Sequence, residues 1–347
     1  MRAQLNWIGS YFSPYSGYGR ISLHMIRALK RAGVKVTPVS VQSALWSGEL
    51  LREAGIRFDQ LSIGLMPGDQ LPHVPGKLWG YTMYETTRPP EEHIEQINRT
   101  CERLLVTCEW QAQVYRDAGV LSRIPMHILS PGIDPLEFPY YDRPEDPDRP
   151  YTYLSFDDRE HKASGVARKA FFDAFPHEED VRFIIKTTID NHEGMDMTTA
   201  DPRLIHWRES TPFISSVYAQ VDCLVFPSFG EGWGMPAREA AATGLPVIAT
   251  RWGGLAVDIE KYAIPIQNFK MVENRLYGGE WVFPDVAEVA AHMRWCYENR
   301  VQAKADAKVR SEWVREQTWD KSAASLLSLL EQVYFSSLRK GAGDAAD

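Results

Sequence analysis

One proline-rich stretch divides this chain of 347 residues into two parts with the same kind of organisation. Residues 131–150 contain six prolines, a density that is incompatible with the interior of a helix or sheet and is typical of an extended linker. On both sides of it, short apolar strand patterns alternate with helix patterns. This alternation predicts parallel sheets that carry helices on both faces. We therefore expect an α/β protein with two doubly wound domains in series.

The first part opens with a strand, a loop, a helix and a second strand. Leu5–Ile8 is a short apolar run, and apolar residues recur at three- and four-residue steps over Ile21–Ala32. Gly33 ends this helix, and Val34–Val39 has the composition of a strand. Residues 77–85 predict a further strand of the same part. The second part repeats the alternation, with strands predicted at 151–156, 181–187, 203–207, 223–228 and 246–250, and helices at 163–175, 212–220, 236–243, 285–299, 301–317 and 320–338.

The net charge indicates which partners are disfavoured for this chain, and the cysteines indicate its cellular compartment. The formal net charge is −8, which argues against a nucleic-acid partner because such proteins usually carry a basic face. The four cysteines form no C-x-x-C pair, so we expect reduced, buried thiols and a cytoplasmic location. No apolar run approaches the ~20 residues of a membrane-spanning helix, and peripheral contact with a membrane remains open.

The segment "FPSFGEGWGMPAREAAATGLPVIAT" (226–250) carries the strongest functional pattern. A strand ends in a glycine-rich turn, and Pro236 then suits the first position of an alanine-rich helix. The amides of Gly232, Trp233, Gly234 and Met235 would attract phosphate oxygens at this helix start. Glu239, which we expect in the first helical turn, suits a ribose diol, and Glu231 suits the hydroxyls of another sugar. The combination predicts a site for a nucleotide sugar.

This segment resembles the E-x7-E region of retaining, family-4-type glycosyltransferases with the GT-B architecture. Other stretches are similar to the same family over nearly the whole chain: "SGYGRISLHMIRALKRAGVKVTPV", "SPGID", "SSVYAQVDCLVFPS", "WVFPDVAEVAAHM" and "TWDKSAASLLSLLEQVY". The resemblance implies two Rossmann-like domains that face a central cleft. We expect an N-terminal, acceptor-side domain over 1–135, a linker over 136–150, a nucleotide-sugar-binding domain over 151–320 and a closing helix over 321–340 that returns to the first domain.

The resemblance also implies an activity. It predicts a hexosyltransferase that moves a sugar from a UDP-, GDP- or ADP-sugar to a glycan, lipid-linked or small-molecule acceptor, with retention of anomeric configuration. The histidines form no cluster with metal-ligand spacing, and no D-x-D motif stands in a suitable strand context. We therefore expect no essential metal and no cofactor apart from the donor itself.

Three residues form the catalytic set that the resemblance implies. Lys162 would bind the donor phosphate, and Glu231 would contact the hexose. The family's strand-end arginine is missing, since Phe156 stands about there, and Arg159 is the candidate that reaches the same phosphate from the loop. The glycine that usually follows the lysine is replaced by Ala163.

The remaining candidates have competing structural interpretations. Gly17 and Gly19 would approach the donor diphosphate or simply make a tight turn; they form no dinucleotide fingerprint, because Ser22 stands where the third glycine would be. Glu85 would bind substrate hydroxyls or cap the next helix. His206 would lie in the strand-end stretch where this architecture places the base of the donor, or serve as a buried structural residue.

Two alternatives to a transferase of glycans, lipids or small molecules stay open at this stage. The first is an enzyme of the same fold that glycosylates nucleic-acid bases, which the negative charge disfavours. The second is a nucleotide-sugar-binding protein with weakened turnover, which the missing arginine suggests.

Overall fold

The computed structural model describes residues 4–10, 12–41, 48–143, 146, 148–157, 160–177, 180–187, 201–208, 211 and 213–335. The chain divides into two compact units. Unit 1 comprises Met1–Met83, Pro90–Gly132 and Gln317–Asp347, and unit 2 comprises Tyr84–Pro89 and Ile133–Glu316. Within the described ranges, no helix combines the length and apolar character needed to cross a bilayer.

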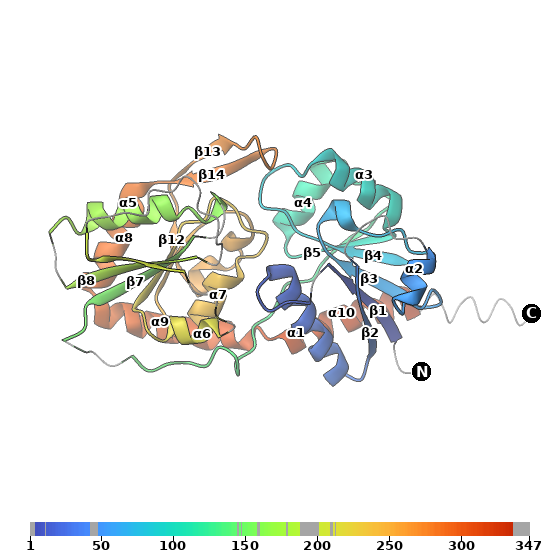
Figure 1. Ribbon diagram of the computed structural model, residues 1–347, viewed down its shortest axis with the longest axis horizontal. Helices are drawn as coiled ribbons and strands as arrows, with labels where there is room; N and C mark the ends of the chain where they lie inside the picture. Colours follow the sequence, from blue (N-terminus) through green and yellow to red (C-terminus); the bar gives the residue numbers. More distant parts are fainter. Residues whose placement is uncertain are drawn as a thin grey trace, which may run out of the picture. The chain divides into compact units, whose positions relative to one another are not determined.

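Unit 1 is built on a six-stranded parallel sheet with the order β2-β1-β3-β4-β5-β6 (Figure 1). Strand β1 is the second strand of the sheet, with β2 at the edge on one side of it and β3 on the other, so the strand order reverses between β1 and β3. The elements of unit 1 are β1 (Gln4–Gly9), α1 (Gly17–Arg31), β2 (Lys35–Ser40), α2 (Gly48–Glu53), β3 (Leu61–Leu65), η1 (Gly68–Gln70), β4 (Leu78–Tyr81), α3 (Glu91–Thr100), β5 (Arg103–Val106), α4 (Glu109–Asp117), β6 (Met126–Ile128), α10 (Trp319–Leu330) and η5 (Glu331–Phe335).

The last long helix belongs to unit 1, although it is distant from the rest of that unit in sequence. Trp319 of α10 stacks on His24 of α1, with ring centroids 5.1 Å apart. Ser322 donates a hydrogen bond to the carbonyl of Ser130 at 2.7 Å. A Cβ atom at Gly132 would lie 2.3 Å from the backbone nitrogen of Trp319, so only glycine allows the chain to pass this closely.

Unit 2 holds a second six-stranded parallel sheet, with the order β12-β11-β10-β7-β8-β9, and a separate antiparallel hairpin, β13–β14. The strand order reverses between β7 and β10, the two central strands. Its elements are β7 (Tyr151–Phe156), η2 (Glu160–Lys162), α5 (Ser164–Ala174), β8 (Val181–Lys186), β9 (Leu204–Trp207), α6 (Ile214–Tyr218), β10 (Cys223–Phe226), α7 (Met235–Ala242), β11 (Val247–Thr250), η3 (Gly253–Ala256), η4 (Ile259–Lys261), β12 (Ile264–Ile266), β13 (Phe269–Glu273), β14 (Glu280–Pro284), α8 (Val286–Glu298) and α9 (Arg300–Glu316).

Helices cover both faces of the unit 2 sheet, as the continuous apolar strands predict. Successive residues of β7 point to opposite sides: Tyr153 packs with α5 and α8, whereas Leu154 packs with α7 and α9. Figure 1 shows these helices around the sheet. Both side chains are completely buried. Each central strand is therefore fixed from two sides, and the loops that follow β7 and β10 start from rigid positions.

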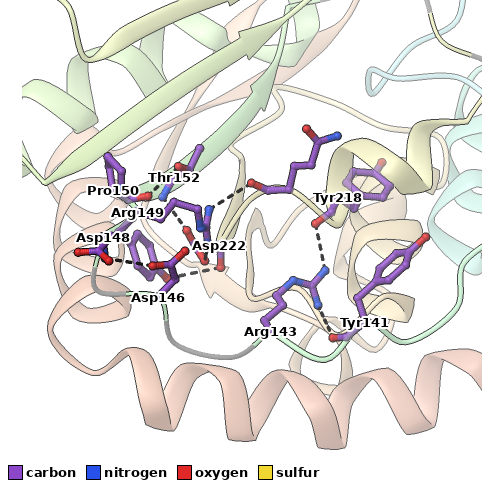
Figure 2. A network of polar contacts seen from close by, with 11 residues as sticks. Tyr141, Arg143, Asp146, Asp148, Arg149, Pro150, Thr152, Tyr218 and Asp222 are labelled. Carbon is purple, nitrogen blue, oxygen red and sulfur yellow. Dashed lines mark hydrogen bonds and ion pairs between the residues drawn. The ribbon is translucent and has the colours of Figure 1, made fainter.

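Two arginines of the proline-rich segment, which is expected to form an extended linker over 136–150, attach this segment to unit 2. Arg143 donates to the carbonyls of Tyr218 and Thr243 at 3.0 and 2.6 Å. Arg149 pairs with Asp222 at 2.5 Å (Figure 2). Proline favours an extended backbone, and these side-chain contacts then attach that backbone to the end of α6 and the start of β10.

Candidate active site

The predicted functional residues of unit 2 gather at the carboxyl ends of its two central strands. Lys162 ends η2, in the loop that follows β7, and Glu231 lies in the loop that follows β10. The strand order reverses between these strands, and ligands of open α/β sheets bind in the crevice at such a point. The topology therefore places both residues at the edge where a ligand is expected.

Lys162 and Glu231 form a buried ion pair. Lys162 Nζ lies 2.5 Å from Glu231 Oε1, and the two residues are 9% and 7% exposed. Ser228 Oγ donates to the same carboxylate oxygen at 3.1 Å, and His161 Nε2 lies 3.9 Å from it. The ammonium group also lies 4.9 Å from the centre of the Phe226 ring. A lysine and a glutamate that are 69 positions apart in sequence are thus held together with little access to water.

The two departures from the family pattern have clear structural consequences. Phe156 packs edge-on against Phe226 and Tyr218, with centroid distances of 6.4 and 6.2 Å, so the strand end carries aromatic packing in place of a cation. Ala163 adopts a left-handed conformation with φ 55° at the start of α5. Glycine adopts that conformation without strain, and alanine does not. Arg159 lies outside the described residues.

The glycine-rich turn owes its shape to close backbone packing. Gly234 has φ 79°, and a Cβ atom there would lie 2.2 Å from the Leu255 side chain. A Cβ atom at Gly254 would lie 2.4 Å from the carbonyl oxygen of Gly232, and the Gly254 amide donates to the Glu231 carbonyl at 2.8 Å. The turn after β10 and the loop after β11 therefore lie in direct contact, and larger residues at these positions would separate them.

The second acid of the motif, Glu239, is buried in the second turn of its helix and not in the first. Helix α7 begins at Met235 and has no acidic residue in its first turn, so the expectation that Glu239 lies in that turn is wrong. Glu239 opens the second turn, on the same face as Met235, because side chains four residues apart are neighbours on a helix. It is 5% exposed. The helix starts earlier because Gly234 supplies a left-handed residue immediately before it.

Arg238 is a residue of this site that the sequence did not reveal. It is 6% exposed, and its guanidinium lies 3.9 Å from the Trp233 ring centre and 4.5 Å from that of Tyr262. It donates to the carbonyl of Trp233 and to those of Gly254 and Val257 at 3.1 and 2.9 Å. An arginine in an alanine-rich helix usually lies at the surface, and the neighbouring aromatic Trp233 is the signal that could have identified its burial.

The segment that carries Glu85 belongs to unit 2 and not to the first domain, where the strand prediction over 77–85 had placed it. Strand β4 ends at Tyr81, and Tyr84 then donates to the carbonyl of Tyr277 at 2.5 Å. The Thr87 amide donates to the Glu280 carbonyl at 2.9 Å. Glu85 is half-buried, and its carbonyl oxygen would lie 2.0 Å from a Cβ atom at Gly230. Glu85 therefore lies beside the loop that leads to Glu231.

Gly17 and Gly19 open α1 in unit 1, and they differ in what surrounds them. A Cβ atom at Gly19 would lie 2.3 Å from the carbonyl oxygen of Ser13, whereas one at Gly17 would meet nothing within 4 Å. The side chain of Ser16 caps the helix by accepting from the Gly19 amide at 3.1 Å. The tight-turn interpretation thus accounts for Gly19, and Gly17 has no packing reason to be glycine.

His206 lies on the edge strand of the unit 2 sheet. It stands on β9 opposite Ile185 of β8, and β8 separates it from β7 and the loop of Lys162. It is half-buried. The sheet order therefore separates His206 from the Lys162–Glu231 pair by a full strand.

Comparison with known proteins decides the family. Residues 111–326, more than half of the chain, match the family model described as "Family 4 Glycosyltransferase in conflict systems". The chain belongs to this family. The match includes the whole of the Lys162 loop and the E-x7-E segment.

Local matches to curated proteins of this kind are short. This family 4 glycosyltransferase is 45% identical over 47 residues to D-inositol 3-phosphate glycosyltransferase of Corynebacterium kroppenstedtii. The matched stretch is 14% of this chain and 10% of that protein. The enzyme of the same name from Pseudarthrobacter chlorophenolicus is 35% identical over 74 positions, covering 21% of this chain and 16% of that protein. The chain thus spans a small part of the length of these relatives.

Solved structures establish the fold over almost the entire chain. The Anabaena protein HepE in complex with UDP and glucose is similar with a TM-score of 0.69 at 13% identity, covering 96% of this chain and 100% of that one. A glycosyltransferase from Rickettsia africae reaches a TM-score of 0.72 at 11% identity, covering 95% and 98%. Sucrose-phosphate synthase from Thermosynechococcus elongatus has a TM-score of 0.69 at 14% identity, covering 96% and 100%. This family 4 glycosyltransferase therefore has the GT-B fold of two Rossmann-like domains.

Proposed function

We propose that this protein transfers a hexose from a nucleotide diphosphate-sugar to a hydroxyl group of an acceptor, with retention of the anomeric configuration. The observation that carries the proposal is the buried Lys162–Glu231 pair at the point where the strand order reverses in unit 2. The glycine turn before α7 and the buried Glu239 lie on the same loop and helix. These are the groups that a diphosphate, a hexose and a ribose require.

Each group has a role in the proposed reaction. The Lys162 ammonium and the amides of the turn hold the diphosphate, while Glu231 accepts hydroxyl hydrogen bonds from the hexose and Glu239 accepts those of the ribose. The bond between the anomeric carbon and the phosphate oxygen breaks, and the acceptor oxygen forms a bond to that carbon on the same face. The acceptor proton passes to the departing phosphate, and the nucleoside diphosphate leaves. No side chain of the enzyme forms a covalent intermediate.

The ion pair prepares Lys162 for this role. A lysine in a loop is usually mobile, and ordering it on binding costs side-chain entropy. Here the ammonium is already fixed by Glu231 and lies over the Phe226 ring. A donor phosphate would therefore meet a pre-positioned cation in a region of low water access, where charge–charge interactions are stronger than in bulk water.

The names of similar proteins support the donor class and guide the choice of ligands. UDP and glucose are bound in the HepE structure, and UDP-2-fluoro glucose is bound in a similar trehalose-6-phosphate protein from E. coli. UDP-hexoses are therefore the first donors to test, with GDP- and ADP-sugars beside them. The four buried free cysteines support a reducing, cytoplasmic environment for the enzyme.

Calorimetric titration with UDP-, GDP- and ADP-sugars tests the proposal. We expect one donor series to bind the wild-type protein and to lose its affinity in Glu239→Ala. Lys162→Ala should bind the donor more weakly and should slow donor hydrolysis about 10²–10³-fold, the range for losing a group that stabilises developing charge. Turnover should continue in the presence of EDTA. Failure of every donor to bind, or donor binding that is indifferent to both substitutions, would rule out this site.

A further inference from the structure

The buried Arg238 holds the glycine turn and the loop after β11 together with a single side chain. Its three carbonyl acceptors come from both segments: Trp233 from the turn, and Gly254 and Val257 from the loop. We propose that Arg238 is a positioning residue that turns the peptide groups of the donor site so that they present N–H groups and not carbonyls to the diphosphate. This inference rests on the function proposed above.

Peptide geometry gives the mechanism. In a trans peptide, the carbonyl and the following N–H point to opposite sides of the chain. Arg238 Nη1 binds the carbonyl of Trp233, so the N–H of Gly234 in the same peptide points away from the guanidinium. The backbone cannot relax from this arrangement without losing φ 79° at Gly234, which is packed against Leu255. The arginine thus selects one of the two orientations that this peptide could take.

Electrostatics favours the same arrangement. A carbonyl oxygen that faced the donor site would repel a phosphate. The guanidinium instead binds three carbonyl oxygens, so these oxygens point toward Arg238. Arginine suits this task because its planar fork presents several donors at once and its charge is permanent. The rings of Trp233 and Tyr262 hold the plane of the guanidinium. Their centres lie 3.9 and 4.5 Å from Arg238 Cζ.

The opposite end of the same helix offers a matched control. Arg143 is half-buried, and it too donates to three backbone carbonyls. Figure 2 shows its bonds to Tyr141 and Tyr218, and the third acceptor is the carbonyl of Thr243. Its acceptors include Thr243, the residue that caps the C-terminus of α7, whereas the glycine turn lies at the α7 N-terminus. Removing Arg143 should therefore remove a comparable set of hydrogen bonds without reorienting the peptides of the turn.

The test compares Arg238→Met and Arg238→Lys with Arg143→Met. For each protein, calorimetry measures the affinity for the nucleoside diphosphate that binds the wild type best among UDP, GDP and ADP, and competition measures the affinity for the matching nucleoside without phosphates. The melting temperature is recorded for all variants. Steady-state kinetics with the corresponding sugar donor then separates kcat from KM.

We expect Arg238→Met to weaken diphosphate binding by about tenfold or more, by analogy with the loss of the hydrogen-bond partners that orient metal ligands, and to leave nucleoside affinity nearly unchanged. Arg238→Lys should recover part of the loss, and Arg143→Met should lower the melting temperature while it keeps both affinities. If Arg238→Met does not fold, Arg238→Lys against Arg143→Lys makes the same comparison.

Two results overturn the inference, and they are distinguishable. If the wild-type protein binds none of the three diphosphates, the proposed function fails and this inference falls with it. If the wild-type protein binds one of them but the Arg238 variants lose diphosphate and nucleoside affinity to the same extent, or behave like the Arg143 variants, Arg238 is a structural residue alone and the proposed function stands.

Discussion

Replacing Lys162 by methionine should destabilise unit 2 by about 3–5 kcal/mol, the usual cost of leaving one member of a buried ion pair without its partner. The two side chains of the pair are 11% and 10% exposed, and the Nζ–Oε1 distance is 2.5 Å. Methionine is similar in length to lysine and apolar, so it leaves the Glu231 carboxylate with the hydroxyl of Ser228 and without the ammonium. For a domain of about 150–250 residues, each kcal/mol lowers the melting temperature by about 2–4 °C, so a drop of about 6–20 °C is expected.

A double-mutant cycle with an exposed control separates the ion pair from the other effects of substitution. The cycle combines Lys162→Met and Glu231→Gln, alone and together. The control cycle uses Lys169 and Asp173 on α5, an ion pair at 2.7 Å whose side chains are 64% and 45% exposed. The control should give a coupling of about 0.3–0.5 kcal/mol because water screens it. The buried pair should give a coupling several times larger.

Thermal and urea unfolding, each followed by circular dichroism and fitted with separate transitions for the two units, measure both cycles. In the double variant no unpaired charge remains, so we expect it to be more stable than Lys162→Met. A coupling between Lys162 and Glu231 that does not exceed the coupling of the exposed pair would refute the reasoning, because the two side chains would then not be paired away from water.

Three further predictions concern backbone and thiols. Ala163→Gly should stabilise the protein by about 1 kcal/mol in urea unfolding, since alanine is strained at φ 55°; no gain would show that this conformation is not adopted. Gly230→Ala should destabilise by about 1–3 kcal/mol, because its Cβ would lie 2.0 Å from the Glu85 carbonyl, whereas Gly165→Ala, with open space at its Cβ, should not destabilise. Burial raises the pKa of the Cys101 thiol to about 11, so iodoacetamide at pH 8 should leave it unmodified in the folded protein and label it in urea; rapid native labelling would contradict its burial.

Helices with strong periodicity or clear end signals could be predicted to within one or two residues. The expected helices over 163–175, 285–299 and 301–317 correspond to α5, α8 and α9. Helix α1 starts at Gly17, four residues before the predicted Ile21, because the serine at position 16 caps it. Periodicity alone could not show that start, since the first turn presents glycines and a tyrosine in place of an apolar stripe.

The parts of unit 2 that come from distant segments could not be predicted. The strand pattern over 77–85 is correct as far as Tyr81, but the following residues pair with Glu280 and Tyr277, nearly 200 positions away. The hairpin β13–β14 was not predicted either, because it alternates exposed and buried residues only weakly. Local composition determines the type of an element, whereas long-range hydrogen bonds determine which unit it joins.

In the candidate active site, too, the local elements could be predicted from the sequence and the long-range contacts could not. The E-x7-E segment indicated a strand, a turn and a helix at the edge of a sheet, and the structure has β10, the glycine turn and α7 in that order. The pairing of Lys162 with Glu231 depends on β7 and β10 being neighbours, and no local pattern encodes that. The role of Arg238 depends on carbonyls that carry no sequence signal at all.

The aromatic residue at the end of β7 changes how the cation of the site is held. Phe156 packs edge-on against Phe226, and the Phe226 ring in turn lies 4.9 Å from Lys162 Nζ. A cation over an aromatic face gains about 0.5–2 kcal/mol, depending on how well it is shielded from water. Lys162 is thus fixed from one side by this aromatic pair and from the other by Glu231. Phe156 therefore restricts Lys162 through the Phe226 ring. Because Phe156 stands at this strand end in place of a cation, more of the charge on the leaving diphosphate would fall in the proposed reaction to Lys162 and the peptide groups that Arg238 orients.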